Sequence, residues 1–113
     1  MAEEVVNVYS HRHYETDQAL FDKFTEQTGI KVNVVKGGDD GVLERLKQEG
    51  DKTPADVLIT ADVMRLSRAK EMGLLQPVES EVLDQVVPGN LRDPGNEWFG
   101  LTKRARVIVY AKD

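Results

Sequence analysis

Residues 5–35, "VVNVYSHRHYETDQALFDKFTEQTGIKVNVV", predict a strand, a helix and a second strand in direct succession. Residues 5–10 are mostly β-branched and apolar, which favours a β-strand. Residues 15–28 place their large apolar side chains near one side of a helix, and Gly29 is a typical helix stop. Residues 30–35 alternate between apolar and polar side chains, as a strand does. This order predicts a right-handed crossover and a pair of parallel strands.

The rest of the chain continues the alternation of helices and strands. A helix that buries Val42, Leu43 and Leu46 is expected after a glycine-rich loop, and "ADVLIT" (55–60) predicts a strand buried on both faces. The remaining expected elements are a helix capped by Asp62 that ends at Gly73, a helix at 81–87 capped by Ser80, and strands at 98–101 and 104–112. We therefore expect one α/β domain over residues 1–113, a three-layer sandwich with a mostly parallel sheet.

Composition excludes several classes of function. The chain has 113 residues and a net charge of −5, which argues against nucleic acid or an anionic membrane as the main partner. It contains no cysteine, so disulfides, thiolate metal sites and cysteine nucleophiles are excluded. No apolar run reaches the roughly 20 residues that a membrane-spanning helix needs. These properties are those of an ordinary globular protein.

Polar side chains gather where the first predicted strand ends, at "SHRHY", residues 10–14. Ligands of parallel α/β sheets bind beyond the carboxyl ends of strands, next to helix N-termini. A histidine beside a tyrosine offers an imidazole nitrogen and a phenol oxygen, which suit iron and other cations once the phenol loses its proton. Arg12 and the following helix N-terminus favour an anion. Short motifs of this kind also occur in solvated turns, so both interpretations stay open at this point.

Catalysis is the less favoured interpretation of the same residues. A hydrolase or lyase would use His11 or His13 as a base, with Ser10 nearby as a nucleophile. Nothing like a nucleophile elbow surrounds Ser10, and no set of nucleophile, base and orienting group is evident. We therefore predict a binding protein and no enzyme.

Four segments of the chain together resemble the bacterial periplasmic ferric-ion-binding proteins. They are the opening stretch, "TPADVLITAD", "RLSRAKEMGLLQPV" and "NLRDPGNEWFGLTKRARVIVYAKD". Proteins of this family are the solute receptors of iron(III) ABC transporters and have the two-lobed type II periplasmic-binding-protein fold. The resemblance implies that residues 1–113 are the N-terminal lobe, truncated at the first crossover of the hinge. It also implies a periplasmic, mature chain, since "MAEE" is no signal peptide.

The resemblance assigns site residues by motif. The family's "RHY" motif falls on residues 12–14 and implies that His13 and Tyr14 are ligands of ferric ion. Arg12 and Arg104 match arginines that help to hold a synergistic anion such as carbonate in some members. A pair of adjacent tyrosines in the family's second lobe is missing here, so only part of the iron site is expected.

Two further residues are accessory donors at most. Some members use a glutamate just after the third strand, where this chain has Ala61 with Asp62 beside it. His11 replaces a residue that is usually small in the family, and it is either an extra donor or incidental.

The resemblance also implies partners. An intact receptor delivers ferric ion to an ABC permease, while this fragment is expected to form a homodimer or a domain-swapped assembly through residues 104–112. Two alternatives remain open: an oxyanion-binding lobe for phosphate or sulfate, and an engineered self-associating scaffold unit without a ligand.

Overall fold

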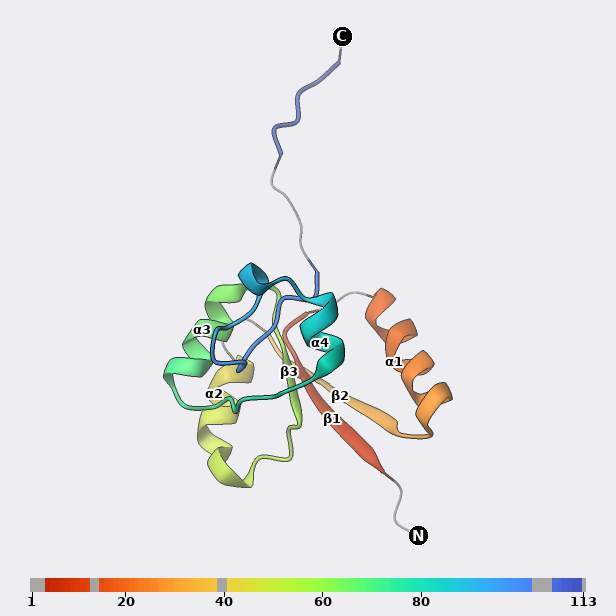
Figure 1. Cartoon of the computed structure of the whole chain (residues 1–113), viewed down its shortest axis with the longest axis vertical. Coiled ribbons are helices and arrows are strands. Elements are labelled where there is room, and N and C mark those ends of the chain that lie inside the picture. The colour runs from red at the N-terminus through yellow and green to blue at the C-terminus, as the bar shows by residue number, and fades with distance from the viewer. Residues whose placement is uncertain (1–3, 13–14, 39–40, 103–106, 113) are drawn as a thin grey trace. The chain divides into compact units, whose positions relative to one another are not determined.

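The computed structural model describes residues 4–12, 15–38, 41–102 and 107–112 (Figure 1). The chain forms two compact units, Met1–Leu74 and Leu75–Asp113. The single domain expected from the sequence stays a prediction, and each unit is described by itself below.

The first unit is built on a parallel sheet of three strands in the order β2-β1-β3. The central strand is β1 (Val5–Ser10), with β2 (Lys31–Lys36) on one side and β3 (Val57–Ile59) on the other. The strands predicted at 5–10 and 30–35 and their parallel pairing are therefore confirmed, the second within one residue at each end.

The third strand is shorter than the predicted 55–60. The carboxylate of Asp56 accepts the N–H of Asn7 at 2.8 Å, so a side chain takes the donor that a longer backbone ladder would use. Val57 is 43% exposed, and no described strand pairs with the outer edge of β3. The expectation of a strand buried on both faces is thus wrong, because Val57 is exposed and Leu58 and Ile59 are only partly buried.

Helices α1 (Glu15–Thr28) and α2 (Gly41–Glu49) lie on opposite faces of the sheet (Figure 1). The chain moves from β1 out to β2 and then back across β1 to β3, and right-handed crossovers in opposite directions place the two helices on opposite faces. The apolar side chains of α2 pack on the face that carries Tyr9. The buried residues there are Val42, Leu46 and Tyr9, with Val35 and Leu58 partly buried beside them. Leu43 of α2 is buried as well.

The helix ends follow the signals in the sequence. Helix α3 (Val63–Glu71) begins after Asp62, whose carboxylate accepts the N–H of Arg65 at 3.0 Å. Gly29 after α1 and Gly73 after α3 have φ values of 75° and 72°, a region that glycine adopts at little cost. A short 3₁₀ turn, η1 (Gly50–Lys52), follows α2.

The second unit contains α4 (Glu81–Val86), capped by Ser80 as predicted, and a 3₁₀ turn, η2 (Gly89–Leu91). The two strands predicted near the C-terminus are not formed in the described residues. Residues 98–101 contribute a single antiparallel bridge, between Phe99 and Arg92, and residues 107–112 have no regular structure. A strand is stable only beside partner strands, and the described residues place none there. Residues 104–106 of the second predicted strand lie outside the described part.

Candidate functional site

The turn after β1 is held by a serine. The buried hydroxyl of Ser10 accepts the N–H of Arg12 at 3.1 Å and donates to the carbonyl oxygen of Arg12 at 2.8 Å. Serine commonly stabilises turns by such local hydrogen bonds. The N–H of His11 donates to the carbonyl oxygen of Ile59 at 2.9 Å, which continues the pairing of β1 with β3 by one residue. The backbone up to Arg12 is therefore fixed on the sheet.

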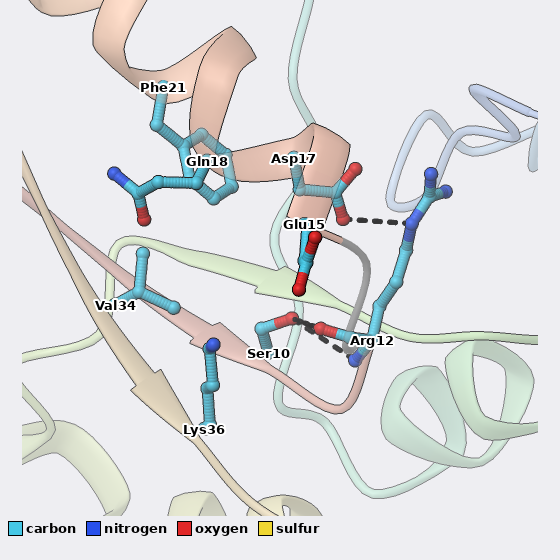
Figure 2. Close-up of a pocket in the computed structure, with 8 residues that line it drawn as sticks. All are labelled: Ser10, Arg12, Glu15, Asp17, Gln18, Phe21, Val34 and Lys36. Atoms are coloured by element: carbon cyan, nitrogen blue, oxygen red, sulfur yellow. Dashed lines mark hydrogen bonds and ion pairs between the residues drawn. The ribbon is translucent and has the colours of Figure 1, made fainter.

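The side chain of Arg12 is paired with α1. Its Nε lies 2.8 Å from Oδ2 of Asp17, and the two side chains are only 19% and 12% exposed (Figure 2). Asp17 lies in the first turn of α1, where a negative charge is stabilised by the helix dipole. The ion pair therefore joins the end of β1 to the start of α1.

A hollow of about 350 Å³ opens between the ends of β1 and β2 and the first turns of α1. The N–H of Gly37 donates to the carbonyl oxygen of Ser10 at 3.0 Å, which keeps the two strand ends together. The hollow is lined by two cationic and two anionic side chains, so their charges balance. Its lining residues are Ser10, Arg12, Glu15, Asp17, Gln18, Phe21, Val34 and Lys36 (Figure 2).

The predicted site residues are only partly placed. His13, Tyr14 and Arg104 lie outside the described residues, so their roles stay predictions. Arg12 lines the hollow, as expected for the carboxyl end of β1. Asp62 lies at the start of α3, where one carboxylate oxygen caps the helix and the other pairs with Nη1 of Arg65. Asp62 lines a different hollow, of about 270 Å³, with Met64, Arg65 and Arg68.

Across the described ranges, no group of three or more His, Cys, Asp or Glu side chains is placed to hold a metal ion. His13 lies outside those ranges. No helix in the described part is long and apolar enough to span a membrane.

Sequence reasoning missed Asp17 as a residue of this site. Its signal was present, because an aspartate in the first turn of a helix that follows an arginine-bearing turn is well placed for an ion pair. Lys36 was missed as well, although the end of the second strand was expected at the same edge of the sheet.

A polar cluster lies next to Tyr9. The Tyr9 hydroxyl donates to Oε1 of Glu49 at 2.8 Å, the Thr53 hydroxyl donates to the same oxygen at 3.0 Å, and Arg45 lies over the Tyr9 ring at 5.0 Å. Burial raises the pKa of the Glu49 carboxyl, but the hydrogen bonds from Tyr9, Thr53 and Arg45 and the charge of Arg45 outweigh it, so its pKa lies below the ordinary value. The cluster fastens the end of α2 to β1, one residue before Ser10.

Comparisons with known proteins extend this picture. A family model described as "Bacterial extracellular solute-binding protein" matches residues 9–113. Iron uptake protein A1 of Synechocystis is 58% identical over 107 residues, a match that covers 95% of this chain and 30% of that protein. The major ferric iron-binding protein of Neisseria gonorrhoeae is 32% identical over 109 residues, covering 93% of this chain and 32% of that protein.

One solved structure has a sequence identity to this chain close to that of the Synechocystis protein. The Trichodesmium protein IdiA (FutA), in complex with iron and citrate ligands, has 53% sequence identity and a TM-score of 0.82. The match covers 85% of this chain and 30% of that one. The chain thus spans about a third of the length of the proteins it resembles.

Proposed function

Because the chain belongs to the family of bacterial extracellular solute-binding proteins, we propose that it binds ferric ion as part of an iron(III) ABC importer's receptor. The observation that carries this proposal is the high sequence identity of the chain to an iron uptake protein and to a protein whose structure was solved in complex with iron and citrate. Membership of the family and the α/β fold of one periplasmic-binding-protein lobe are confirmed. The relatives are solute-binding proteins, and we assign this chain no catalytic role.

The proposed iron ligands are His13 and Tyr14. Their positions in the sequence fall between Arg12, at the carboxyl end of β1, and Glu15, the first residue of α1. This is where parallel α/β sheets bind ligands. The phenolate of a tyrosine and the imidazole of a histidine are suitable donors for ferric ion. Two protein donors make up only part of an octahedral shell, so the binding by this chain alone is weak; His11 and Asp62 are proposed as accessory donors at most.

The setting of this function is proposed from the same relatives. One of them carries the name "Fe(3+)-binding periplasmic protein", in Serratia marcescens, and we place this chain in the periplasm with an ABC permease as its partner in the intact receptor. Self-association of the chain through 104–112, as a homodimer or by domain swapping, is also proposed.

Titration with ferric citrate tests the iron proposal. Coordination of a phenolate to ferric ion produces a visible charge-transfer band, and the substitution Tyr14→Phe should abolish it because the phenolate is gone. Tyr110→Phe is the matched control, since Tyr110 is 86% exposed in the second unit, and it should keep the band. His11→Ala should reduce the band less than Tyr14→Phe does. A band of undiminished intensity in Tyr14→Phe would remove Tyr14 from the site.

A second candidate function is an oxyanion-binding lobe. It is favoured by Arg12 and Lys36, which line the hollow beside the N-terminus of α1. Glu15 and Asp17 oppose it, because their charges balance the two cations. If Arg12 and Arg104 hold an anion, Arg104→Ala should weaken binding of phosphate or carbonate without unfolding the chain. Calorimetric titration with each anion measures this, and a large loss of stability in Arg104→Ala would instead indicate a structural ion pair.

A further inference from the structure

We propose that the hollow between the ends of β1 and β2 and the first turns of α1 binds a small zwitterion of the aliphatic amino-acid type. Its ammonium group lies at the carboxylate of Glu15, and its own carboxylate lies at the ammonium of Lys36. Binding of this ligand requires neither ferric ion nor His13 and Tyr14, so it goes beyond the proposed function.

Two of the four charged side chains around the hollow are paired with each other. Nε of Arg12 lies 2.8 Å from Oδ2 of Asp17, and these side chains are 19% and 12% exposed. Two opposite charges this close largely cancel each other's field at the distance of a ligand. The pair therefore gives the hollow a polar wall that is close to neutral.

The other two charged side chains come from different elements. Glu15 is the first residue of α1, Lys36 is the last residue of β2, and both line the hollow (Figure 2). Among the described residues, neither side chain has a hydrogen-bond or ion-pair partner. A ligand with a single charge is attracted by one of them and repelled by the other, whereas a zwitterion satisfies both.

The remaining lining sets the size and the polarity of the ligand. Phe21 and Val34, both partly buried, supply an apolar surface for a short hydrocarbon group. The volume of about 350 Å³ is at the lower end of the range for small-molecule sites. The carboxyl ends of parallel strands are also where α/β folds bind ligands. L-leucine, which joins both charged groups to a branched apolar side chain, is therefore a suitable probe.

Three compounds test the need for both charges. Isocaproate is L-leucine without its amino group, and isopentylamine is L-leucine without its carboxylate. In an NMR titration without iron, L-leucine should shift the backbone amide signals of Gln18, Phe21, Val34 and Lys36. It should bind about tenfold more tightly than either compound with one charge, as expected for the loss of one charged hydrogen-bond partner. No shifts with L-leucine, or equal binding by either single-charge compound, would overturn the inference.

Two variants assign each charge of the ligand to its partner. Lys36→Met should weaken the binding of L-leucine and isocaproate but not that of isopentylamine, and Glu15→Gln should do the reverse. Both side chains are exposed, so Tm should change little in either variant. Glu26→Gln and Lys47→Met are the matched controls, since they change the net charge equally at exposed positions away from the hollow. A loss of affinity in the controls as large as in the two variants would reduce the effect to net charge and refute the site.

The zwitterion site and the iron site fail independently. Binding of L-leucine by a chain that gives no charge-transfer band with ferric citrate would refute the iron proposal and leave the zwitterion site standing. A charge-transfer band in a chain that does not bind L-leucine would do the opposite.

Discussion

Replacement of Gly37 by alanine should destabilise the fold that positions the site. Gly37 follows β2, and its N–H is bound to Ser10. A Cβ atom built on Gly37 would lie 2.3 Å from Cγ2 of Val42 and 3.6 Å from the Cβ of Val42. Two carbon atoms reach optimal contact only at about 3.5–4.0 Å. The added methyl group therefore overlaps a side chain of the core.

The size of the effect follows from the surroundings of Val42. This side chain is 4% exposed and packs with Tyr9 and Leu46. A helical valine has one strongly preferred χ1 rotamer, so its methyl group cannot turn away without strain. Overpacking of a core typically costs about 1–3 kcal/mol. At roughly 4 °C per kcal/mol for a chain of this size, Tm should fall by roughly 4–12 °C.

Thermal unfolding followed by circular dichroism measures this difference. Gly38→Ala is the matched control, because a Cβ at Gly38 meets no described atom within 4 Å and the residue does not have a positive φ. That substitution should leave Tm unchanged or raise it slightly, since it restricts the unfolded chain. In Gly37→Ala/Val42→Ala the overlapping methyl group is gone, so the double variant should lose less stability than the two single losses added together. A Gly37→Ala variant as stable as Gly38→Ala would refute the steric argument.

The remaining predictions concern the effect of pH on stability and the self-association of the chain. Since the pKa of Glu49 is lowered in the folded state, its contribution to stability is present above the ordinary value of 4.5 and is lost as pH falls through the folded-state pKa. Tyr9→Phe should therefore destabilise the chain more at pH 7 than at pH 3 in urea unfolding, and an equal loss at both would count against the Tyr9–Glu49 hydrogen bond as the cause. Self-association through 104–112 should appear as dimers or larger species in sedimentation at low micromolar concentration, and a monomer throughout would contradict it.

Much of the first unit could be predicted because its signals are local. The strand and helix periods of residues 5–36 depend on side chains only two to four positions apart. The caps at Asp62 and Ser80 and the stops at Gly29 and Gly73 depend on the conformation of one or two residues. The place of the candidate site follows from the same order of elements, since a parallel sheet brings its strand ends to one edge.

The sequence by itself determined the order of the elements, the family resemblance and the edge of the sheet where a ligand is expected. Only the tertiary structure decided that β3 is a short strand, that residues 107–112 form no strand among the described residues, and that Asp17 pairs with Arg12. The physical reason is that a ladder needs a partner strand and an ion pair needs its partner charge within a few ångströms. Local patterns along the chain do not encode those distances, because they arise only when β1, β2 and α1 come together.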